Sequence, residues 1–181
     1  MDNRNWPQTV LTFWFDELKK KDWFISTPEI DKTITDRFAA LHTRLYIENK
    51  LPDEPDQNQA LASVIVLDQF PRNMYRGSGK AFASDALALQ LTKQAMRAKL
   101  DADMSTDQKQ FLYMPFMHSE NLEDQQQGLV LFTELDLGQH AQDHLELIER
   151  FGRFPHRNEL LGRQSTAEEI DYLIEGKRFG Q

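Results

Sequence analysis

Apolar residues recur along most of the chain with the 3.6-residue period of an α-helix. Near the start, one such face is formed by Leu11, Phe15 and Leu18. A longer stripe of the same kind follows, formed by Ile30, Ile34, Phe38, Leu41 and Leu45. This spacing predicts amphipathic helices, each with one face turned towards a protein core.

Helix start and stop signals agree with this period. Capping side chains precede early prolines in Asn5-Trp-Pro7 and Thr27-Pro28, and capping-box spacing occurs in Ser105-Thr-Asp-Gln108 and Ser165-Thr-Ala-Glu168. Stop signals are supplied by Pro71 after Phe70 and by Gly138, Gly152, Gly162 and Gly176. Together these signals predict helices at about 5–19, 28–49, 56–70, 84–100, 106–118, 121–136, 139–151, 156–161 and 166–175.

The run Ala62-Ser-Val-Ile-Val-Leu67 could also be a buried strand, because periodicity does not decide so short a segment. Its context favours a helix, since the same face opens after Pro55 and closes at Pro71. Asn-Gly and Asp-Gly hairpin turns are absent from the sequence. The sequence therefore predicts an all-α fold, built as antiparallel stacked helical hairpins of about nine helices in a single domain over residues 1–181.

The least regular segment is 71–83, which is rich in loop-forming residues. Tyr75 and Phe82 interrupt it, and we expect these aromatic side chains to hold the loop against the protein. No tetratricopeptide consensus repeats at a fixed period along the chain.

Composition narrows the class of protein. The chain has 181 residues, of which 40% are hydrophobic, and it contains no cysteine. It is thus too apolar for a disordered chain, and it has no disulfide, thiolate zinc site or cysteine nucleophile. The first residues show no secretory signal, and the longest apolar run, 60–67, is too short to span a membrane. We therefore expect a cytoplasmic protein that does not bind membranes.

Charge is unevenly distributed around a formal net charge of −8. Residues 101–149 carry a net charge of −10, whereas residues 150–163 carry +3. The acidic whole argues against nucleic-acid binding, which needs a basic footprint. The short basic segment suits a small anion better than a polymer backbone.

Three long motifs carry a family resemblance: Leu67-Asp-Gln-Phe-Pro-Arg-Asn-Met-Tyr-Arg-Gly77, Phe111-Leu-Tyr-Met-Pro-Phe-Met-His-Ser-Glu120 and Ile148-Glu-Arg-Phe-Gly-Arg-Phe-Pro-His-Arg-Asn158. They resemble the bacterial domain-of-unknown-function family 924. The opening Val10-Leu-Thr-Phe-Trp-Phe15 and the closing Leu161-Gly-Arg-Gln-Ser-Thr-Ala-Glu-Glu169 fit the same family. The resemblance implies a tetratricopeptide-like all-helical superhelix without a legible repeat. It implies no established reaction, cofactor or ligand.

The basic segment supplies the first candidate site, with Arg150, Arg153, His156 and Arg157 around a helix break. Arginine binds carboxylate and phosphate through paired hydrogen bonds, and we expect His156 near the start of a new helix, which also favours anions. The structural alternative is that these arginines pair with the acids of 101–149 and lock helices together.

The second candidate follows Asp68, where Arg72, Tyr75 and Arg76 leave a helix end. We interpret this segment as the opposite wall of the same anion pocket, with Tyr75 offering a hydroxyl. The structural alternative is an Asp68–Arg72 pair that fixes the helix end.

The third candidate is the acid–base pair His118 and Glu120 beside Pro115, which we expect to bend its helix. Imidazole titrates near neutral pH, so His118 is the candidate catalytic acid or base and Glu120 the group that orients it. The alternatives are a buried structural histidine and a metal site formed by His118, Glu120 and His144.

These residues predict a helical protein that binds a small phosphate- or carboxylate-bearing ligand, with acid–base catalysis by His118 and Glu120 as an optional step and without a cofactor. The alternative is a tetratricopeptide-like module that binds a peptide or protein partner. A groove of exposed aromatic residues, or a homodimer with apolar surface around Trp6, Trp14 and Trp23, would favour that alternative.

Overall fold

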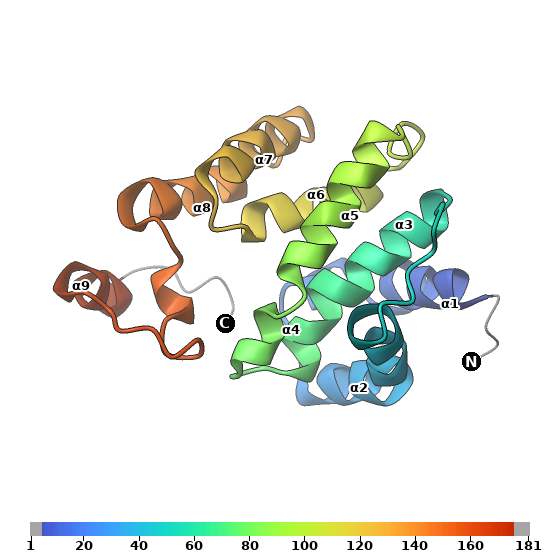
Figure 1. The fold of residues 1–181 in the computed structure, drawn as a ribbon, viewed down its shortest axis with the longest axis horizontal. Helices are drawn as coiled ribbons and strands as arrows, with labels where there is room; N and C mark the ends of the chain where they lie inside the picture. Colours follow the sequence, from blue (N-terminus) through green and yellow to red (C-terminus); the bar gives the residue numbers. More distant parts are fainter. Residues whose placement is uncertain (1–4, 176–181) are drawn as a thin grey trace.

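The computed structural model describes residues 5–175, and every regular element within this range is helical, which confirms the all-α prediction (Figure 1). None of the helices in this range is long and apolar enough to cross a membrane. The α-helices are α1 (Trp6–Thr12), α2 (Pro28–His42), α3 (Gln57–Val64), α4 (Phe70–Met74), α5 (Asp85–Arg97), α6 (Thr106–His118), α7 (Leu122–Glu134), α8 (Gly138–Phe151) and α9 (Ala167–Glu175).

π-Helical and 3-10 turns extend or connect these helices. The π-helical turns Phe13–Glu17 and Thr43–Ile47 lengthen α1 and α2, so the predicted helices 5–19 and 28–49 each correspond to an α-helix with a π-helical end. The 3-10 turns lie at Lys20–Trp23, Gly79–Phe82 and Pro155–Arg157. The predicted helix 156–161 is wrong, because a single 3-10 turn stands there and the chain then continues in turns.

Local capping chemistry explains several of the helix starts. The Thr27 hydroxyl accepts from the backbone N–H of Ile30, and Ser105 forms a capping box with Gln108. The capping box predicted at Ser165 lies one residue later in the structure. There, Thr166 and Glu169 exchange bonds at the start of α9, at 2.7 and 3.2 Å.

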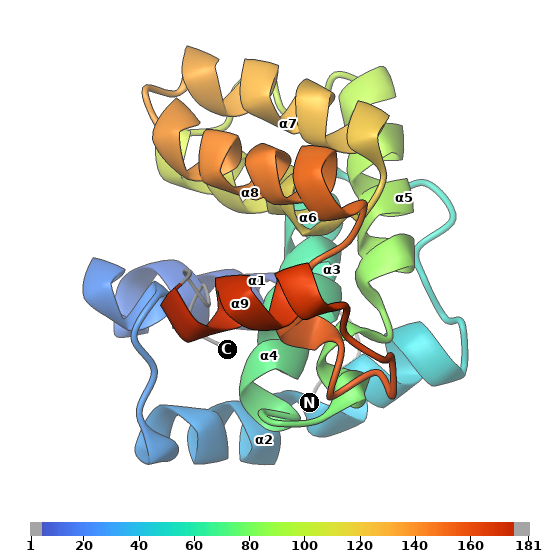
Figure 2. The same ribbon diagram turned by 90° about the vertical axis from the view of Figure 1, so that its left-hand side faces the viewer.

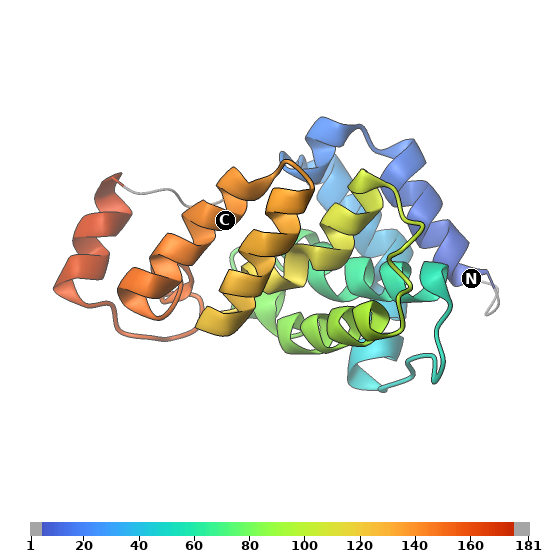
Figure 3. The ribbon, with the colours of Figure 1, turned by 90° about the horizontal axis from the view of Figure 1, so that it is seen from above.

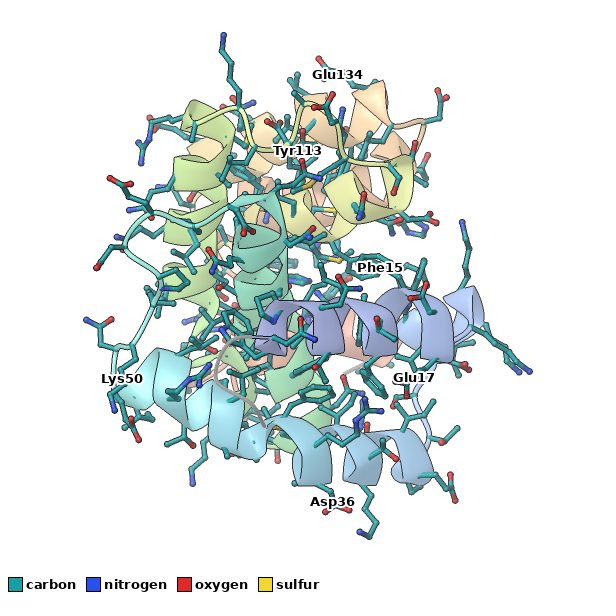
Figure 4. All side chains as sticks on the ribbon, turned by 90° about the vertical axis from the view of Figure 1, so that its right-hand side faces the viewer. Phe15, Glu17, Asp36, Lys50, Tyr113 and Glu134 are labelled. Carbon is teal, nitrogen blue, oxygen red and sulfur yellow. The ribbon has the colours of Figure 1, made fainter. Side chains whose placement is uncertain are left out.

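Helix α3 and its continuation α4 form the centre of the fold. They pack against α1 and α2 as well as α5 and α6 (Figures 1 and 3). Aromatic rings fill the space between these helices: Trp14 lies edge-on to Phe111 of α6 at 5.3 Å, and Phe38 of α2 lies 4.7 Å from Phe70. Phe15 also points from the π-helical turn after α1 towards α6 (Figure 4). Helices distant in sequence are thus joined by one apolar core.

The tryptophans belong to this core. Trp6 and Trp14 are buried, and Trp23 is half-buried with its indole N–H donated to the Trp14 carbonyl at 2.7 Å. Beside Trp23, the apolar side chains of Phe24 and Ile25 are exposed, so some apolar surface remains around this tryptophan.

Pro71 does not end its helix as the sequence predicts. A π-helical turn, Ile65–Gln69, precedes it, and the helix continues as α4 to Met74. Proline has no N–H, so the carbonyl of Leu67, four residues earlier, lacks its usual helical donor. The Ser84 hydroxyl donates to that carbonyl at 2.6 Å instead. Tertiary contact therefore compensates for the proline, and a sequence pattern does not reveal it.

The segment after α4 is held against the protein, as predicted. Phe82 is buried and Tyr75 is half-buried, with its ring 5.8 Å from that of His42. Gly79 lies in contact with the C-terminal segment, because a Cβ atom built there would stand 2.6 Å from the Leu160 carbonyl oxygen. Only glycine fits this approach without a shift of the backbone.

Helices α6, α7 and α8 stack side by side at one end of the molecule (Figure 2). Gly152 ends α8 with a positive φ of 67°, and the chain then turns back towards α4. A small second apolar cluster forms here, from Leu147, Ile148 and Phe154 with Phe151 and Tyr172 packed against it. This return places residues 155–173 beside the 71–83 segment.

We expect Ser84→Ala to lower the free energy of unfolding by about 1–3 kcal/mol, because the buried Leu67 carbonyl loses its donor. Urea denaturation of the purified variant measures this loss. Thr133→Ala is the matched control, since its exposed hydroxyl also donates to a carbonyl, and we expect a change within about 0.5 kcal/mol. Equal losses in the two variants would contradict the role given to Ser84.

Candidate functional site

A cavity of about 350 Å³ lies between the 72–82 segment and the returning C-terminal segment. Its polar lining consists of Arg72, Arg76, His156, Glu159 and Ser165. Its apolar lining consists of Ala81, Phe82, Pro155, Leu160 and Leu173. The fold thus places Arg72, Arg76 and His156 around one cavity, and the two sequence motifs together had predicted this convergence.

Arg72 is held by two carboxylates. It forms a bidentate pair with Asp85 of α5, with both N···O distances at 3.0 Å, and its Nη1 lies 3.6 Å from Asp68 Oδ1. The same nitrogen donates to the Asp68 backbone carbonyl, so the predicted Asp68–Arg72 pair at this helix turn is present. Only 13% of the Arg72 side chain is exposed. Arg72 therefore reaches the cavity with its charge already compensated.

Asp68 is fully buried and also binds His118, whose Nδ1 lies 2.7 Å from Asp68 Oδ1. Gln69 donates to the other carboxylate oxygen at 2.5 Å. Burial alone would raise the pKa of Asp68, but the charges of His118 and Arg72 and the hydrogen bonds from His118 and Gln69 lower this pKa to about 2. Burial lowers the pKa of His118, and the Arg72 charge lowers it further. The pair is thus an ionised Asp68 carboxylate that accepts the Nδ1–H of His118.

Glu120 does not orient His118, so that part of the acid–base hypothesis is wrong. Its carboxylate forms a bidentate pair with Arg163, at 2.7 and 2.9 Å, and accepts the backbone N–H of Phe154 at 2.8 Å. Burial raises the Glu120 pKa, but these bonds lower it more. Glu120 therefore ties the end of α6 to the C-terminal segment, and Asp68 stands where Glu120 was expected.

Arg157 joins the same buried network from the C-terminal segment. Its guanidinium lies between the rings of Phe82 and Phe154, 4.5 Å from each centroid. Its Nη1 donates to the His118 carbonyl at 3.1 Å and to Asp85 at 3.4 Å. Burial lowers the pKa of Arg157 to about 10, with a further contribution from Arg72, so the group stays charged at neutral pH. Arg157 thus fastens the cavity wall rather than lining the cavity.

Arg150 and Arg153 pair with acids of α9, not with those of 101–149. Arg150 binds Glu168 at 2.8 Å, and Arg153 binds both oxygens of Glu169 at 2.7 and 2.8 Å. Neither arginine is among the lining residues. Of the acids in 101–149, Glu120 is the one that takes an arginine of the basic segment, Arg163. The structural alternative therefore describes this part of the cluster, although with different partners.

Arg76 is the most accessible arginine of the cavity, with 46% of its side chain exposed. Its Nε and Nη2 bind Asp31 of α2 at 2.9 and 3.1 Å. Asn73 and Ser26 also donate to that aspartate. Within residues 5–175, Arg76 Nη1 has no hydrogen-bond partner. Tyr75, the predicted hydroxyl donor, turns towards His42 instead and does not line the cavity.

His144 and His156 are neutral in the folded protein. Burial lowers the pKa of His144 to about 3, and the nearby His118 adds to this effect. Burial and the Arg157 charge lower the pKa of His156 to about 4. His144 Nδ1 lies 2.9 Å from the Met117 carbonyl, which requires that nitrogen to carry the proton. His156 therefore offers the cavity a neutral imidazole rather than a cation.

The metal-site alternative required Glu120 beside His118 and His144. Glu120 is bound by Arg163, and within residues 5–175 no group of three or more His, Cys, Asp and Glu side chains is arranged to hold a metal ion.

Several residues that shape the site escaped the sequence analysis. Asp85 binds Arg72, Asp31 binds Arg76, and Glu169 binds Arg153. Each of these acids lies in the first turn of a helix, where acids are common, so the sequence does not reveal its arginine partner. The apolar residues of the cavity wall, Phe82, Leu160 and Leu173, belong to no sequence motif that marks them as lining a cavity. The signal that pointed to these acids was the excess of arginine in one motif, because such arginines need acidic partners elsewhere in the chain.

Comparison with known proteins gives a consistent family and no activity. The family described as "Bacterial protein of unknown function (DUF924)" matches residues 10–177. The structure of a protein of unknown function from Agrobacterium tumefaciens is similar, with 36% sequence identity and a TM-score of 0.88, covering 94% of this chain and 97% of that one. No curated protein matches the chain.

We expect Asp68→Asn to lower the free energy of unfolding by about 3–5 kcal/mol, because Arg72 keeps a buried charge with one partner fewer. Urea denaturation at pH 7 measures the loss. Glu17→Gln is the control: Glu17 pairs with Arg37 at the surface between α1 and α2 (Figure 4), and such pairs contribute about 1 kcal/mol or less. A loss for Asp68→Asn no larger than that of the control would contradict the buried network.

Acidification from pH 7 to pH 4 should destabilise the protein through its buried histidines. An unfolded histidine takes up a proton near pH 6.5, whereas burial holds the folded pKa of His144 at about 3 and that of His156 at about 4. The unfolded chain therefore binds more protons below pH 6.5, and stability is lost as the pH falls from there.

His144→Asn tests this expectation, because the Asn amide keeps a donor for the Met117 carbonyl but does not titrate. Thermal unfolding of this variant should depend less on pH between 6.5 and 4 than that of the original protein. His140→Asn, at an exposed position of the same helix, serves as the control. Identical pH profiles for all three proteins would show that His144 is not responsible.

Proposed function

The chain belongs to the DUF924 family of bacterial proteins of unknown function, and from this premise we propose that it binds a small anionic ligand in the cavity between the 72–82 and 155–173 segments. The observation that carries the proposal is the convergence of Arg72, Arg76 and His156 on one cavity, although they come from motifs about 80 residues apart. The volume, about 350 Å³, lies within the range of small-molecule sites.

Arg76 is the principal anion-binding group in this proposal. Its guanidinium combines an exposed position with a spare terminal nitrogen, whereas Arg72 is locked between Asp68 and Asp85. Ser165 also supports a polar ligand. Its hydroxyl oxygen accepts from Asn158 at 3.0 Å, so the hydroxyl proton can be donated elsewhere. Arginine and hydroxyl donors together suit a phosphate or carboxylate oxygen.

Acid–base catalysis is not part of this proposal. His118 and Glu120 lie outside the lining, and each is bound to a partner that fixes it in place. The proposal is therefore a ligand-binding protein in the cytoplasm, and an enzyme assay becomes useful once a ligand is in hand.

A second candidate is a peptide- or protein-binding module, and one observation favours it. Ile170 and Ile174 lie one turn apart on α9, with 51% and 75% of their surfaces exposed. Such an apolar stripe on a helix is common at partner-binding surfaces. If Ile170→Ser with Ile174→Ser leaves anion binding intact, the two functions use separate surfaces.

Thermal unfolding with phosphate, nucleotides, sugar phosphates and short carboxylates tests the anion site. A ligand present at ten times its Kd should raise the melting temperature by roughly 3–6 °C for a chain of this size. Arg76→Ala should fold normally and lose the shift, because its pair with Asp31 is half-exposed. Arg150→Ala, which removes an exposed arginine outside the cavity, should retain it. No shift with any anion, or an equal shift in Arg76→Ala, would contradict the proposal.

A further inference from the structure

The charges around the cavity do not favour a doubly charged ligand. Asp85 and Asp68 compensate Arg72, and Asp31 compensates Arg76 through two hydrogen bonds. Glu159 adds a negative charge to the lining itself. His156 contributes no positive charge at neutral pH, since burial lowers its pKa to about 4. A phosphate dianion would therefore lose much of its hydration and meet little uncompensated positive charge.

The apolar residues of the cavity lining come from three different segments of the fold. Phe82 comes from the 3-10 turn before α5, Leu160 from the turn after Pro155–Arg157, and Leu173 from α9. Ala81 and Pro155 complete this surface. Inorganic phosphate or another compact ion would leave these side chains in contact with water. An apolar ligand body that covers them is favoured, because it removes their apolar surface from water.

The donors at the cavity match a single carboxylate. Arg76 Nη1 and the Ser165 hydroxyl are available for hydrogen bonds, and a carboxylate needs few donors compared with the three terminal oxygens of a phosphate. Arg72 offers the ligand no free bidentate fork, because Asp85 occupies that fork.

We propose that the cavity takes a monoanionic carboxylic acid with an apolar body of about the size of a phenyl ring, bound by Arg76 and Ser165 and packed against Phe82, Leu160 and Leu173. This inference rests on the proposed function, since it names the class of anion that the same cavity binds.

Four probes test the ligand class by isothermal titration calorimetry at pH 7: phenylacetate, its neutral analogue phenylacetamide, phenyl phosphate and inorganic phosphate. We expect phenylacetate to bind at least tenfold more tightly than each of the other three. The amide removes only the charge, phenyl phosphate adds a second charge, and inorganic phosphate lacks the apolar body. Each comparison therefore isolates one part of the argument.

Two pairs of variants assign the binding to this cavity. Leu160→Asn should weaken phenylacetate binding about tenfold, whereas Leu161→Asn, at the exposed neighbouring position, should not change it. Arg76→Ala should reduce the preference for phenylacetate over phenylacetamide, and Arg150→Ala should preserve this preference. Circular dichroism and melting temperature confirm that all four variants are folded.

The outcomes separate this inference from the proposed function. Tighter binding of phenyl phosphate or inorganic phosphate, lost in Arg76→Ala, would overturn the carboxylate assignment and leave the anion site standing. Equal binding of phenylacetate and phenylacetamide would overturn both, because charge would then play no part. Failure of every probe to bind, together with no shift in the anion panel, would also overturn both.

Discussion

Asp68 carries its negative charge at a position that water does not reach. A buried charge is costly unless other groups bind it, and three of them do so here: Arg72 from the next helical turn, Gln69 and His118 of α6. Through Arg72 the network extends to Asp85 of α5 and from there to Arg157 of the C-terminal segment. The cavity therefore depends on this network, because it fixes the positions of the segments on both sides of the cavity.

The π-helical turn at Ile65–Gln69 and the proline after it belong to the same arrangement. A π-helical turn contains one residue more than an α-helical turn. A regular α-helix through this region would therefore point the Asp68 side chain in a different direction. The carbonyl groups freed near Pro71 are bound by Ser84 and by Arg72. Backbone irregularity and buried charge are thus satisfied by the same few side chains, which explains how an apolar helix accommodates both.

Most of the fold could be predicted from local sequence signals. The rest depends on contacts between segments that are distant in the sequence. Helices α5 to α8 agree with their predicted bounds to within a few residues, because apolar period and capping act within a turn or two. Pro71 misled the prediction, since the donor that replaces its N–H lies on another segment. Of the candidate site residues, Arg72, Arg76 and His156 line the cavity, and the sequence drew attention to them because arginine-rich motifs beside helix breaks are recognisable in a sequence. Their partners Asp85 and Asp31 were not recognised, because an acid at a helix start has the same appearance whether or not an arginine later packs on it.

The Phe82–Arg157–Phe154 sandwich has a consequence for the order in which the protein is made. Synthesis proceeds from the N-terminus, and domains begin to fold while the chain is still emerging. The main core draws on residues from Trp6 to Ala141, so most of it can assemble before the C-terminal segment leaves the ribosome. One wall of the cavity comes from residues 155–173 and is fastened by Arg157. A nascent chain can thus possess nearly its whole core while one wall of the cavity is still missing.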